Sequence, residues 1–255
     1  MPGITPLPSG VATLGLTWST EKGELGSGLT QGKATFDTRT GGLLELENAS
    51  TGKTIIEKGT PTDVGANGVI AWGRWIGGQS KVKSSSGNSG NGNSNGSGGD
   101  DGAKGNLATL HYFAVNATPS GAVSGRFTSF ASTAPTVQSD GKLVATGTVN
   151  SATGTVTASL SLLTGGTASY SLTVPVAGQT FSLVGVGTQT SSSGFSGISL
   201  ITSTGTGCLG GCTGSLGNNV SVIGQIAGAQ GTQAGVAYGF NSRLGNVSGV
   251  IVFKR

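Results

Sequence analysis

The sequence predicts an all-β protein whose larger part is an antiparallel up-and-down β-barrel of about eight strands. Glycine takes 49 of the 255 positions, Thr takes 33 and Ser takes 32, and short apolar runs recur between glycine-containing turns. Only 9% of the residues are charged, against about 25% in an average soluble domain. A disordered chain carries more charge and fewer β-branched residues. The chain is therefore expected to fold, and to fold as β-structure.

The N-terminal part is predicted to be an extension of the barrel. Residues 1–32 are rich in Gly, Pro, Ser and Thr and are expected to form a flexible lead-in with at most one strand, at Ala12–Trp18. Residues 33–83 alternate strand-like runs with turn sequences, which is typical of consecutive antiparallel pairs. Such a short segment would be marginally stable alone, so we expect it to be continuous with the rest of the fold.

A low-complexity segment of Gly, Ser and Asn separates this extension from the barrel. Residues 84–102 include no apolar side chain, so the segment cannot bury anything and is predicted to be disordered. We assign residues 84–105 to this insertion. It is either a linker between domains or a long surface loop between two strands of one domain.

Residues 106–255 are predicted to form the barrel, because strand-like runs recur every 10 to 14 residues with glycine turns between them. In the run Thr155–Leu163, apolar residues alternate with Thr and Ser, which indicates one core face and one polar face. Evenly spaced strands of this kind favour an up-and-down barrel or a sandwich. The predicted strands are Leu107–Asn116, Ala122–Ala131, Lys142–Val149, Thr155–Leu163, Thr167–Val174, Thr180–Val186, Phe195–Ile201, Asn219–Ala227, Gln233–Phe240 and Val247–Phe253.

The charge distribution argues against nucleic acid as a partner. The net charge is +4, but every acidic residue except Asp140 lies at or before Asp101. Residues 105–255 hold five scattered bases and no basic cluster. Phosphate neutralisation needs several cations on one surface, so no nucleic-acid binding is expected.

The two cysteines, Cys208 and Cys212, enclose Leu-Gly-Gly. A structural zinc site needs four ligands, so no metal site is expected here. The two glycines make a tight loop and a local disulfide geometrically feasible, and a disulfide would indicate an oxidising compartment. The alternative is two free thiols in a loop.

The residues available for catalysis in the predicted barrel are His111 and Asp140. Asp140 occupies a hairpin-turn sequence, where Asp is favoured for backbone reasons. His111, alone in a predicted strand, is expected to be a hydrogen-bonded structural residue. Acid–base catalysis needs several titratable groups in one cleft, so no catalytic residue, no enzymatic activity and no cofactor are predicted.

The most aromatic stretch of the chain, Gly68–Ile76, contains Trp72, Arg74 and Trp75. In a strand, Trp72 and Arg74 lie on one face. An arginine against an indole ring can form a binding surface, so these three residues are the candidate partner-binding surface. The alternative is that one tryptophan belongs to the core and the other covers it.

The C-terminal residues carry a family resemblance. Gly224–Gly228, Gln233–Phe240 and Gly249–Phe253 resemble the closing strands of the transferrin-binding-protein-B-like β-barrel domain, which is also found C-terminal to FecR domains in Gram-negative bacteria. Residues 72–75, 110–112 and 133–136 look like the upstream half of the FecR-associated version, so that the resemblance covers roughly residues 65–255. It implies an exported, eight-stranded antiparallel barrel without catalytic activity. Ile226 and Gln233 depart from the family pattern, which usually has an aromatic and an acidic residue there.

We therefore predict a non-enzymatic, extracytoplasmic binding module of a Gram-negative periplasm, outer membrane or cell surface. Its expected partner is a protein, either a host or an envelope component, and association with the outer membrane is compatible with this view. An eight-stranded barrel can hold one small ligand, but the inward residues look able to fill it. The alternative function is a structural or adhesive subunit that self-assembles.

Overall fold

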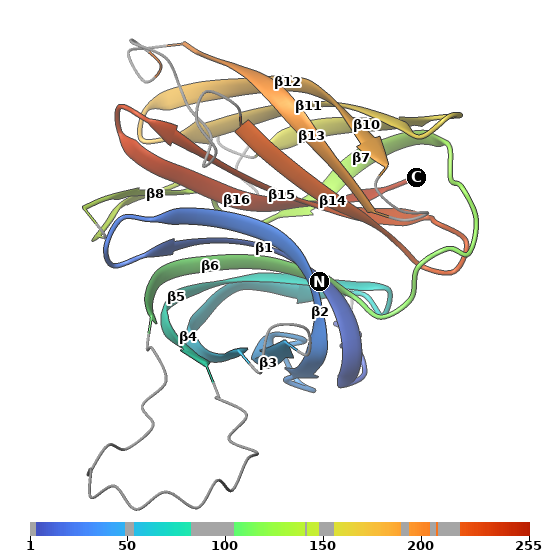
Figure 1. Ribbon diagram of the computed structural model, residues 1–255, viewed down its shortest axis with the longest axis horizontal. Helices are drawn as coiled ribbons and strands as arrows, with labels where there is room; N and C mark the ends of the chain where they lie inside the picture. Colours follow the sequence, from blue (N-terminus) through green and yellow to red (C-terminus); the bar gives the residue numbers. More distant parts are fainter. Residues whose placement is uncertain are drawn as a thin grey trace, which may run out of the picture.

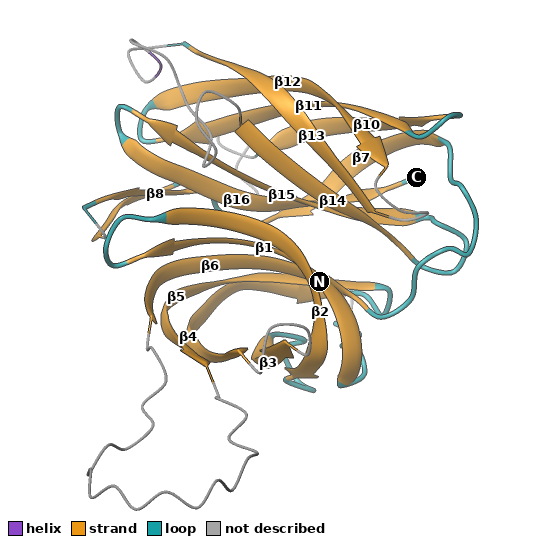
Figure 2. Cartoon of the chain, in the orientation of Figure 1, coloured by secondary structure: helices purple, strands orange, loops and turns teal. Residues whose placement is uncertain are grey.

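The computed structural model describes residues 4–48, 54–82, 105–140, 142–147, 156–189, 194–204, 208 and 220–255. These residues form two closed, antiparallel β-barrels (Figures 1 and 2). The strands of the first barrel are β1 (Gly10–Thr20), β2 (Leu25–Phe36), β3 (Leu43–Asn48), β4 (Thr54–Ala66), β5 (Ile70–Val82) and β6 (Gly105–Val115). The remaining strands are β7 (Gly125–Ser132), β8 (Thr136–Ser139), β9 (Lys142–Thr146), β10 (Thr157–Leu163), β11 (Thr167–Val176), β12 (Gln179–Gln189), β13 (Gly194–Ser203), β14 (Val220–Ala227), β15 (Gln233–Ser242) and β16 (Gly245–Lys254).

The first barrel has six strands, each paired with the next in sequence, and β6 closes it by pairing with β1. Trp75 and Tyr112 are buried inside it, with their rings in an edge contact. Their polar atoms are satisfied by one residue of β3: Trp75 Nε1 donates to the Leu43 carbonyl (3.1 Å), and the Leu43 amide donates to the Tyr112 hydroxyl (2.8 Å). Burial raises the pKa of Tyr112. The barrel interior is therefore packed rather than open.

The second barrel confirms the predicted eight-stranded antiparallel fold. Strands β7 and β10–β16 pair in a ring in which β7 lies between β10 and β16, and β15 pairs with β16. The hairpin β8–β9 pairs with the far part of β16. Along β11 the residues alternate between buried and half-buried, which is the pattern of a strand with one core face. The large side chains buried in its core include Phe127, Tyr170, Phe181, Phe195, Tyr238, Phe240 and Phe253.

The strand pairing moves two of the expected boundaries. Residues 1–32 are not merely a lead-in, because β1 and most of β2 lie there and β1 is needed to close the first barrel between β2 and β6. Residues 106–115, expected to begin the eight-stranded barrel, instead complete the first one as part of β6. The extension is thus a barrel of its own. The low-complexity insertion lies almost wholly outside the described residues, and it connects β5 to β6, which are neighbours in one barrel.

The outer faces of the two barrels pack against each other, β14–β16 against β1, β2, β5 and β6 (Figure 1). The apolar part of this contact includes Ile70, Phe113, Ile223, Val250 and Val252. The Phe113 ring lies so close to Gly15 and Gly235 that a Cβ at either glycine would overlap with it. The close approach of the barrels at this point depends on glycine. Among the described residues, no helix is long and apolar enough to cross a membrane.

Candidate functional site

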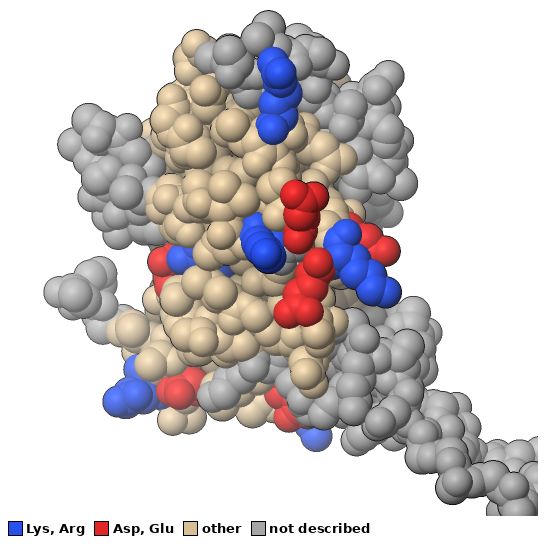
Figure 3. All heavy atoms as spheres, turned by 90° about the vertical axis from the view of Figure 1, so that its left-hand side faces the viewer, with Lys and Arg blue, Asp and Glu red and all other residues tan. Residues whose placement is uncertain are grey.

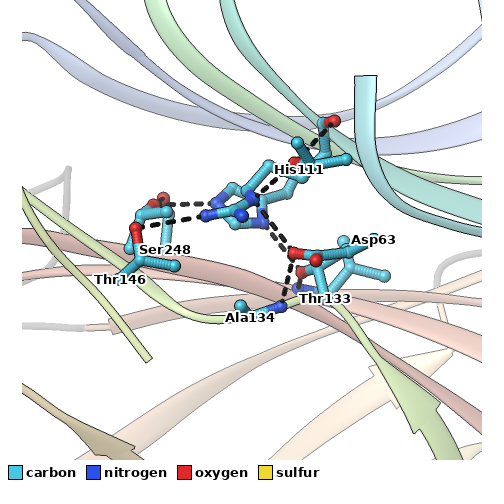
Figure 4. Close-up of polar contacts among 10 residues, drawn as sticks. Asp63, His111, Thr133, Ala134, Thr146 and Ser248 are labelled. Carbon is cyan, nitrogen blue, oxygen red and sulfur yellow. Dashed lines mark hydrogen bonds and ion pairs between the residues drawn. The ribbon is translucent and has the colours of Figure 1, made fainter. Parts of the chain in front are cut away.

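A buried polar cluster joins the two barrels beside the apolar contact (Figure 4). Arg74 of β5 and Asp63 of β4 form an ion pair, with 3.0 Å between Nε and Oδ2. Asp63 Oδ2 also accepts a hydrogen bond from the amide of Ala134, beyond the first barrel, and Arg74 Nη1 contacts Thr146 Oγ1 of β9 at 3.4 Å. Burial lowers the pKa of Arg74, and Asp63 opposes that shift. Both charges are satisfied by groups that bridge the barrels.

His111 lies at the centre of this cluster and is fully buried. Its Nδ1 is 2.8 Å from Thr133 Oγ1 and its Nε2 is 2.8 Å from Thr136 Oγ1, while Thr136 contacts Ser248 of β16. Burial and then the neighbouring charge of Arg74 hold the pKa of His111 well below its ordinary value. With both ring nitrogens occupied by threonines, His111 is the hydrogen-bonded structural residue that the sequence predicted.

Next to this polar cluster, toward the β1–β2 turn, lie buried polar side chains without a hydrogen-bond partner among the described residues. Ser19 and Thr109 are register partners on β1 and β6, and Gln138 follows Thr136 on the same face of β8. Their side-chain oxygens and the Gln138 nitrogen are buried and have no hydrogen-bond partner within the described part of the chain. Beyond them, Asn246 Nδ2 donates to the Gly23 carbonyl (2.7 Å). The contact between the barrels is thus apolar at one end and polar along the rest.

The predicted partner surface of Trp72, Arg74 and Trp75 is not formed. Trp75 is buried in the first barrel, and Arg74 is 5% exposed between the barrels. Trp72 does share the outer face with Arg74, as the alternation predicted, but its ring packs on Phe130 of the second barrel. The prediction was wrong because the second barrel covers this face, which strand periodicity alone cannot show.

Two other residues singled out in the sequence, Asp140 and Cys208, lie within the described part of the chain. Asp140 lies in the exposed turn between β8 and β9 with a φ of 50°, as expected for a turn Asp. Cys208 is disulfide-bonded, and its predicted partner Cys212 lies outside the described residues. Within the described ranges, no cluster of three or more His, Cys, Asp and Glu residues could hold a metal ion.

The most distinctive exposed surface lies on the second barrel, on the side away from the first (Figure 1). It consists of two rows of outward residues that run across the strands in register. The first, which we call the Arg126 row, is Arg126 of β7, Ser161 of β10, Ser169 of β11 and Val186 of β12. The second, the Lys254 row, is Lys254 of β16, Thr128 of β7, Ser159 of β10, Ser171 of β11 and Val184 of β12.

The two rows together form what we call the ladder face. Each row begins with a cation, continues with hydroxyl groups and ends with a valine. Val184 is 55% and Val186 is 64% exposed, although valine prefers the interior. Two shallow depressions meet on this face at Ser161 and Ser169. Such a surface can offer charge, hydrogen bonds and apolar contact to one partner.

Charge is unevenly distributed between the barrels. Strands β7 and β10–β13 contain no Asp or Glu, and Asp140 is the one acid in residues 105–255. On the face that Figure 3 shows, acidic side chains lie over the middle and lower parts, whereas the upper part is largely uncharged. The second barrel therefore presents a weakly positive surface, and its few cations dominate the electrostatic potential there.

The fold and the surface define a β-protein of two barrels whose second barrel carries the exposed ladder face. No family model and no curated protein matches the sequence. Solved structures similar to this chain include isotype 1 transferrin-binding protein B (TbpB) of serogroup B Neisseria meningitidis, at 12% identity over 95% of this chain and 43% of that one, with a TM-score of 0.43.

A TbpB double mutant of Haemophilus parasuis Hp5 matches at 10% identity over 96% of this chain and 44% of that one, with a TM-score of 0.43. Intact Ap-TbpB, with N and C lobes, matches at 12% identity over 95% and 46%, with a TM-score of 0.44. These are proteins of the family that the C-terminal residues resemble, and this chain spans less than half of their length. The association with FecR domains is not shown.

Proposed function

We propose that this protein is a non-enzymatic binding module that works outside the cytoplasm and binds a protein partner through the ladder face. The observation that carries the proposal is the pair of exposed valines at the end of hydroxyl-lined rows. Exposed apolar groups surrounded by polar ones are typical of protein interaction sites. The disulfide at Cys208 supports an oxidising compartment, which includes the periplasm and the surface of a Gram-negative cell.

Two features argue against an enzyme. His111, which the sequence predicted to be a structural residue, is enclosed between the barrels, and both of its ring nitrogens contact threonine hydroxyls, of Thr133 and Thr136. Asp140 lies in an exposed turn without a described histidine beside it. His111 lies beside Asp63 and Arg74, but this cluster is buried between the barrels, and Asp140 lies apart from it, so neither position offers the accessible cleft that catalysis requires.

The proposal is tested by capture and titration. The purified chain is immobilised and exposed to an envelope extract or host fluid, and any captured protein is identified by mass, purified and titrated calorimetrically. Saturable binding with a fixed stoichiometry supports the proposal. A matched bait, the same chain unfolded by reduction and alkylation in urea, must capture nothing comparable. Absence of saturable binding from every fluid tried would count against the binding module.

Self-assembly is the second candidate function, and one observation favours it. Strand β9 pairs with β8 alone among the described strands, so it is an edge of its sheet, and its Leu143 and Val144 are 37% and 61% exposed. An edge with exposed apolar residues can pair with another chain. Sedimentation velocity at increasing concentration tests this candidate: growth of ordered multimers supports it, and a monomer at all concentrations contradicts it.

A further inference from the structure

We infer that the ladder face binds an extended, acidic protein segment whose carboxylate lies at the Arg126 and Lys254 end and whose apolar side chain lies at Val186 and Val184. This inference rests on the proposed function and names the chemistry of the partner. Four steps lead to it: the gathered cations, the hydroxyl groups between, the exposed valines and the distance that separates the two ends.

Two exposed cations, Arg126 and Lys254, stand where the rows begin. Lys254 is the register partner of Thr128 on β7, two residues from Arg126. Neither is ion-paired within the described part of the chain. A partner carboxylate would meet uncompensated positive charge here, and an arginine can bind it through two parallel hydrogen bonds.

Hydroxyl groups fill the middle of both rows. Ser161 and Ser169 are register partners, as are Ser159 and Ser171, and all four are at least partly exposed. A hydroxyl group can donate one hydrogen bond and accept two. The middle of the face can therefore bind the N–H and C=O groups of an extended peptide without requiring a particular side chain.

The valine end supplies the apolar contact. Val184 and Val186 are two residues apart on β12 and project from the same face. They are more than half exposed, so covering them would remove apolar surface from water, which favours binding by about 25 cal/mol per Å² before the costs of association. An apolar side chain of the partner fits this end, and a charged one does not.

The spacing of the strands sets the length of the segment. Three strand steps separate Arg126 from Val186, and neighbouring strands lie about 4.8 Å apart, so the two ends are separated by about 14 Å. An extended peptide advances about 3.4 Å per residue. The partner's acidic and apolar residues should therefore be about four positions apart.

The inference is tested with the full chain, labelled with ¹⁵N, and a synthetic peptide of sequence acetyl-Leu-Ser-Gly-Ser-Asp-amide. We expect amide shifts confined to β7, β10, β11, β12 and the Lys254 end of β16, and binding that weakens as salt is added. A peptide with Lys in place of Asp should bind about tenfold more weakly or not at all. No shift on these strands, or equal binding of both peptides, would overturn the inference.

Matched variants locate the two ends. Arg126→Glu and Lys254→Glu should each weaken peptide binding about tenfold, whereas Lys142→Glu, the same change in the exposed strand β9, should leave it unchanged. Val186→Ser should weaken binding, whereas Val11→Ser, at a 75% exposed position of the first barrel, should not. Equal effects of a variant and its control would contradict the assignment. All five positions are exposed, so the amide spectra should keep their dispersion.

The same variants separate this inference from the proposed function. If a native partner binds Arg126→Glu and Val186→Ser as tightly as the unaltered chain, the ladder face is not its site. The inference then fails together with the proposed location of the site, while the conclusion that the protein is a binding module stands. If no partner is found for the unaltered chain, the proposed function itself fails.

Discussion

His111 and Thr136 belong to different barrels and are joined through a contact of 2.8 Å between His111 Nε2 and Thr136 Oγ1. On the other side of the ring, Thr133 Oγ1 also accepts a hydrogen bond from the Val250 amide, at 3.0 Å. One side chain of β6 is thereby tied to three segments of the second barrel's sequence. The His111 ring therefore helps to fix the relative position of the two barrels.

Acid should weaken the fold through His111. The folded protein keeps this ring neutral because burial and Arg74 lower its pKa, whereas the unfolded chain takes up a proton below about 6.5. The unfolded state then binds more protons, so the free energy of unfolding falls as pH decreases from about 6.5 toward the folded pKa, by about 1.4 kcal/mol per pH unit. Urea unfolding between pH 7.5 and 5 measures this slope.

His111 is the one histidine of the chain, so His111→Gln is the control for this slope. The variant should be less stable at pH 7.5 but should lose most of the pH dependence between pH 7 and 5.5. An unchanged slope in His111→Gln would show that another group is responsible.

Removing the charge of Asp63 should destabilise the protein strongly. Asp63→Asn keeps a residue that tolerates the observed φ of 52°, so the change isolates the carboxylate. It leaves Arg74 buried without a counter-charge, which should cost about 3 kcal/mol in urea unfolding. The double variant with Arg74→Met should recover part of that loss. A single-variant effect below about 0.5 kcal/mol, typical of a surface pair, would be inconsistent with this account.

An added methyl group at Gly235 should disturb the contact between the barrels. A Cβ there would overlap with the Phe113 ring, so Gly235→Ala should lower the free energy of unfolding by about 1–3 kcal/mol. Gly28→Ala is the matched control, since a Cβ on that residue of β2 meets nothing within 4 Å. Equal effects at both positions would point to backbone conformation rather than packing.

An apolar residue in place of Gln138 should be tolerated. Both polar atoms of its buried side chain lack a partner within the described residues, so Gln138→Leu removes no hydrogen bond and should leave the stability unchanged or raise it by about 1 kcal/mol. Thr136→Val, two residues away, should instead cost about 1–3 kcal/mol because it leaves His111 Nε2 unpaired. A large loss in Gln138→Leu would indicate that the amide is hydrogen-bonded in solution.

Alternation along the strands predicted the architecture of the second barrel but not what covers each face. The pattern of Leu160 and Leu162 placed the core face of β10 correctly, and Trp72 and Arg74 share a face as expected. That this face is buried depends on contacts with residues more than 50 positions later, such as Phe130. Local periodicity contains no information about such contacts. Strand β8 was missed because four residues are too few for a period-two pattern to be recognised.

The sequence of β12 contains a signal for the ladder face. On β12, Phe181 and Leu183 are buried, so the same parity assigns Gly185 and Gly187 to the inner face and Val184 and Val186 to the outer one. Valine outside and glycine inside reverses the usual pattern of a half-buried strand. The cations at the other end of the rows could not be predicted, because Lys254 and Arg126 become neighbours only when β16 pairs with β7.

The pairing of β5 with β6 has a practical consequence for engineering. The low-complexity segment leaves and re-enters the first barrel at adjacent strands, so its ends are held together by the barrel whatever its length. Lengthening such a connection costs only about 0.6 kcal/mol for each doubling. This position is therefore the natural place to insert an epitope tag or a fluorescent domain, because it belongs to the first barrel whereas the ladder face lies on the second.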